Sequence, residues 1–314
     1  MAARLARIVD RALSRLKFKQ LRLLVAVGEH GNIQNAARQL NVSQPAATKM
    51  IKDLEVDFEV QLFHRTNRGV VPTPFGEALI RHGKLIFAQI SNAAQELDDL
   101  NEGSSGRVIV GTLLAASSHL LPSAIEKVLK DRPKVAIKVV EGTNEVLMPA
   151  LRTGEIDLVV GRLPTHRHRS ELSQIKLFDE SIVAITGPKH PLAGRQGLGF
   201  EALRPFGWIL PPIETSLRRQ LDQYFLKMGQ YAPPVALESV SYLTNRTLLQ
   251  SQDLIGLMPA QVAAQDIASE ALVQIGWTVP FGAGPVGVSH RLHGQLSPAG
   301  EALLDALHEA ASEM

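Results

Sequence analysis

The chain has 314 residues, 45% of them hydrophobic and 20% charged, with a net charge of +2 at pH 7; this predicts two or three folding units of ordinary globular composition and does not by itself indicate a nucleic-acid partner. The absence of cysteine excludes disulfides and thiolate catalysis. Because no apolar run approaches the ~20 residues of a membrane span and the basic start lacks the apolar stretch of a secretory signal, we expect a cytoplasmic protein with no membrane partner.

Basic side chains gather at the start of the chain. Between residues 4 and 22, arginine and lysine are frequent and Asp10 is the only acid. A single basic cluster is usually a solvated helix surface, but this concentration in one segment favours contact with phosphates. We treat residues 1–16 as a basic N-terminal extension.

Residues 17–73 predict three short helices followed by a hairpin. The first helix has an apolar face made of Phe18, Leu21, Leu24 and Val25, and Gly31-Asn32 ends it. Ile33, Ala36, Ala37 and Leu40 then share a face of a second helix. A polar turn, Arg65 to Gly69, separates Leu62-Phe63 from Val70-Val71 and predicts a small wing.

The third helix is expected to begin after Ser43, a good N-cap, and Pro45 is tolerated in its first turn. Its apolar face consists of Ala47, Met50, Ile51, Leu54 and Phe58. Its opposite face carries Gln44, Thr48, Lys49 and Lys52. The sequence therefore predicts a polar, basic helix surface directed away from the core.

Residues 74–102 predict one long helix. Spacings of four and three residues place an apolar stripe along it, formed by Leu79, Gly83, Ile86, Ile90, Ala93, Leu97 and Leu100. Such a stripe suits a seam between two helices of a dimer; the alternative is a helix packed on its own domain. Residues 103–106, Gly-Ser-Ser-Gly, are expected to be a hinge.

Residues 107–314 alternate strands and helices. Expected strands lie at 108–111, 135–140, 157–161, 181–186, 235–238, 254–258 and 285–290, and expected helices at 122–130, 145–152, 217–228, 242–250 and 298–310. This order predicts parallel sheets in two α/β lobes, lobe I at about 107–180 and 283–314 and lobe II at about 181–282. A cleft between the lobes, beyond the carboxyl ends of strands, is the expected ligand site.

Residues 32–79 resemble the DNA-binding domain of LysR-type transcriptional regulators. The resemblance rests on Ala36-Ala37, Leu40, Val42 to Ala46, Leu54-Glu55, Leu62-Phe63, Arg65 and Thr73-Pro74. Further matches are Gly154 to Leu158 and His190 to Ala193, in the part of the chain that resembles the family's sensor domain. The phrases LKFKQL, QPAATK and LLAASSHLLP most resemble the subgroup of galactose-binding-protein and protocatechuate-pathway regulators.

The resemblance implies an all-α winged helix-turn-helix, a long linker helix that builds a homodimer or homotetramer, and a two-lobed α/β sensor similar to periplasmic binding proteins. It implies double-stranded promoter DNA as one partner, contacted by Gln44, Pro45, Thr48, Lys49, Lys52, Arg65 and Arg68. Family members commonly have Ser-Arg where this chain has Thr48-Lys49. Because lysine lacks the forked geometry of arginine toward guanine, we expect a different base preference there.

The second implied partner is a small-molecule effector: a sugar, a sugar acid or an aromatic acid. The residues expected to bind it are Ala115, Ser117, Thr143, Gly161, Thr215 and Ser216. Helix capping is the alternative explanation for each hydroxyl. Ala115 stands where the family usually has a hydroxyl, which departs from the pattern that binds carboxylates.

No cofactor, metal or enzymatic activity is expected. His166 and His168 lie in a basic loop without acidic ligands nearby, and His290 and His293 meet the same objection. The motifs of serine hydrolases, P-loop proteins and zinc proteases are absent from the sequence. The alternative functions are a solute-binding receptor without DNA function and an enzyme on a two-lobed α/β scaffold.

Overall fold

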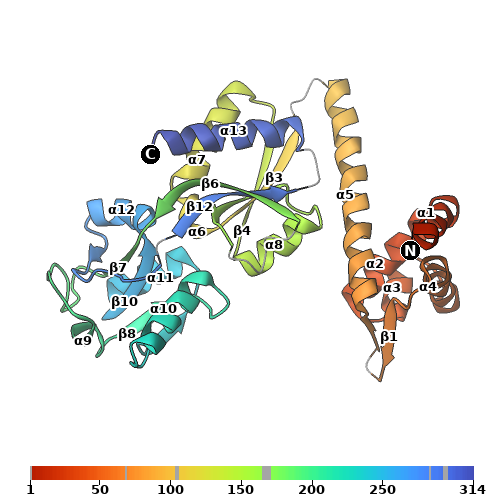
Figure 1. Cartoon of the computed structure of the whole chain (residues 1–314). Coiled ribbons are helices and arrows are strands. Elements are labelled where there is room, and N and C mark those ends of the chain that lie inside the picture. Colours follow the sequence, from red (N-terminus) through yellow and green to blue (C-terminus); the bar gives the residue numbers. More distant parts are fainter. Residues whose placement is uncertain (1, 68, 103–105, 165–170, 283, 293–295) are drawn as a thin grey trace. The chain divides into compact units, whose positions relative to one another are not determined.

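The computed structural model describes residues 2–67, 69–102, 106–164, 171–282, 284–292 and 296–314. The chain forms two compact units, Met1–Ala94 and Gln95–Met314. Figure 1 labels the helices and strands of both units.

The first unit contains the predicted helices and hairpin, preceded by one further helix. Its elements are α1 (Ala2–Arg15), α2 (Phe18–His30), α3 (Ile33–Gln39), α4 (Gln44–Phe58), β1 (Phe63–Thr66), β2 (Gly69–Pro72) and α5 (Pro74–Glu102). Strands β1 and β2 form an antiparallel pair, the wing. Helix α1 occupies the basic extension, for which the sequence pattern gave no secondary structure.

Helix α2 is the centre of this unit. Leu21, Leu24 and Val25 are buried as expected, and so is Leu23, so the helix is covered on more than one side. Phe18, placed on the apolar face by its spacing, is 60% exposed. It is the first residue of α2, and at a helix start the neighbouring turn that would cover a side chain is missing.

Side-chain caps begin the helices that follow. The Asn32 side chain accepts hydrogen bonds from the N–H groups at the start of α3, and Ser43 Oγ accepts one from Ala46 N at the start of α4. Buried Thr73 accepts from Gly76 N at 3.1 Å and donates to Gln61 O at 2.7 Å. These bonds satisfy N–H groups that a helix leaves unpaired at its first turn.

Helix α1 packs against the C-terminal part of α4. Arg11 Nη1 donates to the carbonyl oxygen of Val56 at 3.1 Å. Arg7 and Arg11 both pair with Glu59, at 2.9 and 3.4 Å. The contacts of α1 therefore lie at the end of α4 that is farthest from Gln44, and they leave the start of α4 uncovered.

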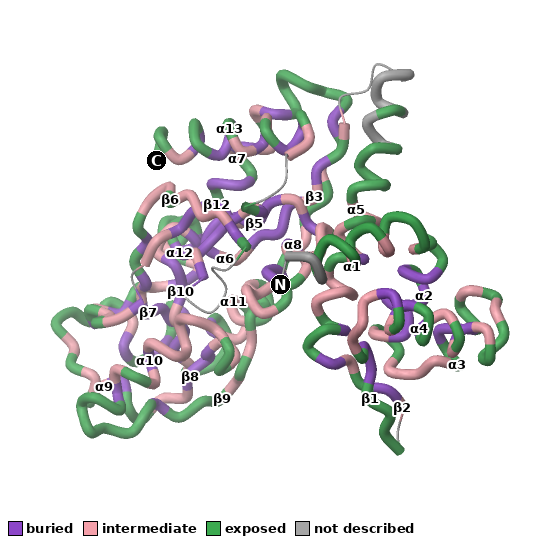
Figure 2. The backbone as a smooth tube through the Cα atoms, turned by 45° about the vertical axis from the view of Figure 1, so that its right-hand side comes forward, coloured by how far each residue is buried: buried purple, intermediate pink, exposed green. Residues whose placement is uncertain are grey.

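The N-terminal half of helix α5 packs on α2 and the core of the first unit. A Cβ added at Gly83 would lie 3.2 Å from Val25 Cγ2, which shows how closely the two helices approach. Leu79 packs against the core of the first unit, so the alternative of packing on its own domain holds for this residue. Ile90 and Leu97, farther along, are 47% and 64% exposed. Figure 2 shows the change from half-buried to exposed along α5.

Gly69 joins the wing to the turn between α2 and α3. Its φ of +136° is a conformation that side chains rarely adopt, and an added Cβ would collide with the carbonyl oxygen of Gly31. That same oxygen accepts a hydrogen bond from Val70 N at 2.8 Å. The glycine is therefore required by both backbone conformation and space.

We expect Gly69→Ala to destabilise the first unit by roughly 1–3 kcal/mol, because backbone strain and the collision add. Urea unfolding followed by circular dichroism measures this. Gly199→Ala is the matched control, since Gly199 has ordinary φ (−84°) and open space around it. Equal stability losses in the two variants would contradict the assignment.

The second unit has two five-stranded sheets in its described part, ordered β4-β3-β5-β12-β6 and β11-β7-β10-β8-β9. The first uses β3 (Arg107–Thr112), β4 (Ala136–Glu141), β5 (Leu158–Arg162), β6 (Leu172–Glu180) and β12 (Gly284–Arg291). The second uses β7 (Ile182–Thr186), β8 (Gly207–Leu210), β9 (Val235–Glu238), β10 (Leu254–Pro259) and β11 (Val273–Gln274).

The expectation of parallel sheets was wrong for part of each sheet. Strand β3 pairs in parallel with β4 and β5, and β8 with β9 and β10. By contrast, β12 pairs antiparallel with β5 and β6, and β7 pairs antiparallel with β10 and β11. The β-α-β pattern correctly predicts the strands that a crossover helix connects in parallel. Strands β6, β7 and β12 lie where the chain passes between the two sheets without a crossover helix, and these strands make the antiparallel pairs.

Helices cover both faces of each sheet. Around the first sheet are α6 (Leu114–Ser117), α7 (Leu120–Asp131), α8 (Asn144–Arg152) and α13 (Pro298–Ser312). Helices α7 and α13 lie side by side on one face, and α8 lies on the other (Figure 1). Around the second sheet are α9 (Phe200–Leu203), α10 (Ser216–Lys227), α11 (Tyr242–Ser251) and α12 (Ala260–Ala268).

Two aromatic and aliphatic cores fill the second lobe. Trp208 is fully buried and packs edge-on against Trp277, with ring centroids 5.8 Å apart.

Every helix in the described residues is too short or too polar to cross a bilayer.

Candidate functional site

The first candidate site is the surface of α4 that faces away from the core. Ala47, Ile51 and Leu54 are buried beneath it. Of the residues predicted to contact DNA, Gln44, Pro45, Lys49 and Lys52 are exposed and Thr48 is half-buried. The cap at Ser43 and the spacing of the buried residues together direct this basic surface outward, at the start of the helix.

The wing lies next in the chain and is tied to α4. Glu55 Oε1 accepts hydrogen bonds from the N–H groups of Leu62 and Phe63, at 2.9 and 3.4 Å. Arg65, on β1, is exposed. Arg68 lies outside the described residues. An exposed helix face with a hairpin fixed beside it is a surface that can contact DNA bases and phosphates together.

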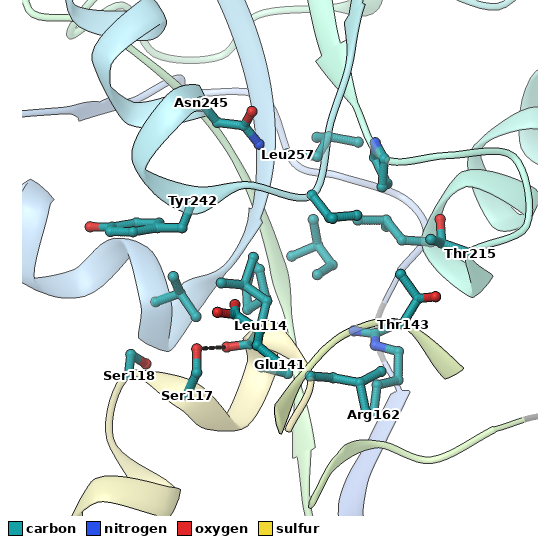
Figure 3. A pocket seen from close by; sticks show the side chains of 18 of the residues that line it. Leu114, Ser117, Ser118, Glu141, Thr143, Arg162, Thr215, Tyr242, Asn245 and Leu257 are labelled. Carbon is teal, nitrogen blue, oxygen red and sulfur yellow. Dashed lines mark hydrogen bonds between the residues drawn. The ribbon is translucent and has the colours of Figure 1, made fainter. Parts of the chain in front are cut away.

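The second candidate site is a cavity of about 1180 Å³ in the second unit. On the side of the first sheet, it is lined by the connections from β3 to α6 and from β4 to α8 and by the end of β5. On the side of the second sheet, it is lined by α10, α11 and α12. It therefore lies between the two lobes, where strands of both sheets end. Figure 3 shows Ser117, Thr143 and Thr215 around it.

The predicted effector residues Ala115, Ser117, Thr143, Thr215 and Ser216 all line this cavity. Their hydroxyls are not equally available. Thr215 caps α10, donating to Pro212 O at 2.7 Å and accepting from Arg218 N, and Ser117 donates to Leu114 O at 3.0 Å. Thr143 stands before α8 but makes no side-chain cap, so capping does not explain this hydroxyl.

The sequence predicts that a ligand approaches the backbone at Gly161. Gly161 is buried within β5 and is not among the residues that line the cavity. Its φ is +142°, and an added Cβ would lie 2.7 Å from Leu113 Cβ. Packing of Leu113 explains the glycine.

Charged residues that the sequence interpretation missed also line the cavity. Arg162 follows Gly161 at the end of β5. Glu145, on α8, and Arg219, on α10, form an ion pair of 3.7 Å that joins the two lobes. A charged residue at the end of an otherwise apolar strand is a sequence signal that identifies Arg162.

Tyr242 forms part of the cavity wall and is held from behind. Its hydroxyl donates to Asp266 Oδ2 at 2.5 Å, and Arg246 Nε donates to Asp266 Oδ1 at 2.8 Å. Burial, and then the bond to Asp266, raise the pKa of the Tyr242 phenol. The ring is therefore fixed in place as an apolar surface, with its hydroxyl already used.

Nothing in the described ranges gathers three or more His, Asp or Glu side chains in a group that could hold a metal ion. His290 Nδ1 lies 3.1 Å from the carbonyl oxygen of Arg291. His166, His168 and His293 lie outside the described residues. Buried His190 accepts a hydrogen bond from Leu192 N at 3.0 Å and packs on Phe206, and burial lowers its pKa.

Two family descriptions match the chain. "Bacterial regulatory helix-turn-helix protein, lysR family" matches residues 18–77, and "LysR substrate binding domain" matches residues 101–312. The chain is 32% identical to the transcriptional regulator GbpR of Azospirillum brasilense over 95% of this chain and 87% of that protein. It is 30% identical to PcaQ of Agrobacterium fabrum over 96% of each.

Solved structures share the fold. The structure of full-length CbnR, solved in complex with its target DNA, matches with a TM-score of 0.62 at 20% identity. The match covers 94% of this chain and 100% of the CbnR chain. A C206 mutant of OxyR from Corynebacterium glutamicum has a TM-score of 0.55 at 26% identity, covering 95% of this chain and 92% of that one.

Proposed function

The chain belongs to the LysR family of DNA-binding transcriptional regulators, and from this premise we propose that an effector bound between its two α/β lobes changes how its helix-turn-helix binds promoter DNA. The observation that carries the proposal is the exposed basic surface of α4 in the same chain as a 1180 Å³ cavity lined by hydroxyls. Because promoter DNA is the proposed target, we also propose that the protein acts in the cytoplasm.

On the DNA side, we propose that α4 enters the major groove and the wing contacts the adjoining backbone. Gln44, Pro45, Thr48, Lys49 and Lys52 would face the bases and nearby phosphates. Arg65, and Arg68 beyond it, would contact phosphates or the minor groove. The exposure of the α4 residues in the folded chain supports this assignment.

The first test is binding of the purified chain to the DNA upstream of its own gene. Because each phosphate contact releases counterions, affinity is expected to fall by roughly 10³-fold or more between 50 and 200 mM salt. A protein that ignores this DNA at low salt would lack the proposed function.

Lys49→Ala is expected to weaken specific DNA binding by roughly 1–3 kcal/mol, because a base contact is lost. A gel-shift titration on promoter DNA and on unrelated DNA measures both affinities. Lys130→Ala, on an exposed end of α7, removes the same charge elsewhere and serves as the control. An unchanged ratio of specific to non-specific affinity in Lys49→Ala would reject base contact by this residue.

For assembly, we propose that the apolar stripe of α5 pairs with the stripe of a second copy. Ile86, Ile90 and Leu97 are 37%, 47% and 64% exposed, and Ala93 is exposed beside them. The Leu100 side chain lies outside the description. Large aliphatic side chains in one line on an exposed helix favour burial against a partner helix. A homodimer, or a tetramer built from two of them, would follow.

For signalling, we propose that ligand binding shifts the balance between arrangements of the two lobes. The ion pair of Glu145 and Arg219 spans the lobes at the edge of the same cavity. A ligand contacting both sides would alter this connection and, through the sensor, the position of the linker helices. We further propose that the chain is a regulator without enzymatic turnover, as its relatives are named transcriptional regulators.

A further inference from the structure

Arg162 is a buried cation on the cavity wall that the proposed function has not used. It is the last residue of β5 and is 8% exposed. Its two terminal nitrogens are buried and have no hydrogen-bond partner in the protein. Figure 3 shows its guanidinium turned to the side of the cavity where Thr143 lies. Burying a guanidinium whose N–H donors have no acceptor costs free energy of folding. A hydrogen-bond acceptor that enters the cavity would lower this free-energy cost.

Glu180 is the acid whose charge acts on Arg162, but no hydrogen bond joins the two side chains. In the first sheet β12 lies between β5 and β6, with Val286 opposite Arg162 and Gly284 opposite Glu180. A Cβ at Gly284 would lie 3.5 Å from Arg162 Nη1, so the guanidinium passes over the glycine. Both carboxylate oxygens of Glu180 are buried without a hydrogen-bond partner, and no ion pair joins the two described side chains.

The Glu180 carboxylate also accepts a proton more readily than an ordinary glutamate does. Burial raises the pKa of its carboxyl to about 7, although the charge of Arg162 opposes the rise. Near neutral pH the carboxyl can therefore take a proton, which leaves the positive charge of Arg162 available to another anion.

The start of α8 adds polar groups beside the guanidinium. Asn144 Nδ2 donates to the carbonyl oxygen of Arg162 at 3.3 Å, which fixes the amide next to it. The Oδ1 atom of Asn144 is buried and has no partner, and the Thr143 hydroxyl does not cap the helix. A helix start favours negative charge, while an unused amide oxygen requires a hydroxyl or other donor.

We propose that Arg162 anchors an anionic group of the effector, so that this cavity takes small hydroxylated organic acids and rejects neutral sugars. This inference rests on the proposed regulatory function and narrows its effector class. A carboxylate can accept two parallel hydrogen bonds from the guanidinium, whereas a sugar hydroxyl would leave the cation without a counter-charge. The effector's hydroxyls would serve Asn144 Oδ1 and Thr143. The carboxylate of the effector would thus bind at Arg162. The hydroxyl that the family usually has near the first strand is missing here, because this position is Ala115.

The test uses the full-length chain and matched pairs of probes that differ in the carboxylate. Gluconate is compared with glucose, and 3,4-dihydroxybenzoate with 3,4-dihydroxybenzyl alcohol, by thermal shift and then by calorimetric titration. At least one acid is expected to bind roughly 10- to 100-fold more tightly than its neutral counterpart, the range of a charge-assisted hydrogen bond. Binding of a neutral counterpart as tightly as its acid, or no response to any acid, would overturn the proposal.

Two variants separate Arg162 from general damage to the fold. The double variant Arg162→Gln/Glu180→Gln removes both buried charges together, so no unpaired charge remains, and it is expected to lose at least about tenfold in acid affinity. Glu180→Gln alone is expected to bind the acid several-fold more tightly, because the charge of Glu180 no longer competes with the acid for Arg162. Retained acid affinity in the double variant contradicts the proposal.

Promoter binding at low salt, measured on the same samples, distinguishes failure of the proposed effector class from failure of the proposed regulatory function. If the wild-type chain binds DNA while the acid preference is absent, the effector class is wrong and the regulatory function stands. If the wild-type chain fails to bind DNA, the proposed function itself fails.

Discussion

Ile90→Glu is expected to dissociate the assembly and to weaken promoter binding by roughly 10²- to 10⁴-fold. The substitution places a carboxylate in the centre of the α5 stripe, where the seam would bury it without a partner. A dimer holds two recognition helices on two half-sites, and losing this linkage removes the gain of the second binding event. Since Ile90 is 47% exposed in the single chain, the fold of each subunit does not depend on it.

Analytical ultracentrifugation measures the change in mass, and titration of a full promoter site against a half-site measures the loss of avidity. Asn92→Glu adds the same charge to an exposed position off the stripe and should leave both unchanged. If Ile90→Glu sediments like the wild type, the apolar stripe of α5 is not the seam, and the dimer must be built elsewhere.

Glu180→Gln is expected to remove a decline in stability of the sensor unit as pH rises. The pKa of Glu180 in the folded chain is about 7, above its ordinary value of 4.5, because burial disfavours the charged carboxylate. The folded state therefore binds the proton more tightly than the unfolded state. The wild-type stability contribution is fully present below pH 4.5 and is lost as pH rises through 7, by on the order of 3 kcal/mol.

Urea unfolding between pH 5 and pH 8, followed by tryptophan fluorescence, measures this directly. Both tryptophans of the chain, Trp208 and Trp277, lie in the second unit, so the signal reports the sensor alone. Asp179→Asn, at an exposed carboxylate of the same strand, is the control and should keep the decline. An equal decline in Glu180→Gln would show that ionisation of Glu180 is not its source.

Helix α4 illustrates what a local sequence pattern can predict. Ser43, Pro45 and the spacing of Ala47, Ile51 and Leu54 predict where α4 starts and which face it buries, and the structure has α4 over Gln44–Phe58 with these three side chains buried. Start signals and periodicity depend on residues within one or two turns of each other, so the sequence contains them in full. The same reasoning predicted a long helix over 74–102, where α5 lies.

Position in the chain predicts the cavity residues less well than it predicts the bounds and buried face of α4. Gly161 appeared suited to a ligand, yet its neighbour Arg162 lines the cavity while Gly161 accommodates Leu113. Thr143 and Thr215 stand at similar places before helices, but only Thr215 caps its helix. Periodicity gives the face on which a side chain lies and cannot give which other segment it meets there.

The sequence by itself determined the family, the order of helices and strands and the basic surface of α4, because these follow from short-range spacing and from motifs that lie together in the chain. Only the tertiary structure decided that β12 lies between β5 and β6, and so that Arg162 and Glu180 are buried near each other without touching. The separation of two charges across a sheet depends on strand order and on the missing side chain at Gly284. Those long-range facts set the electrostatics of the cavity, and with them the class of ligand we propose.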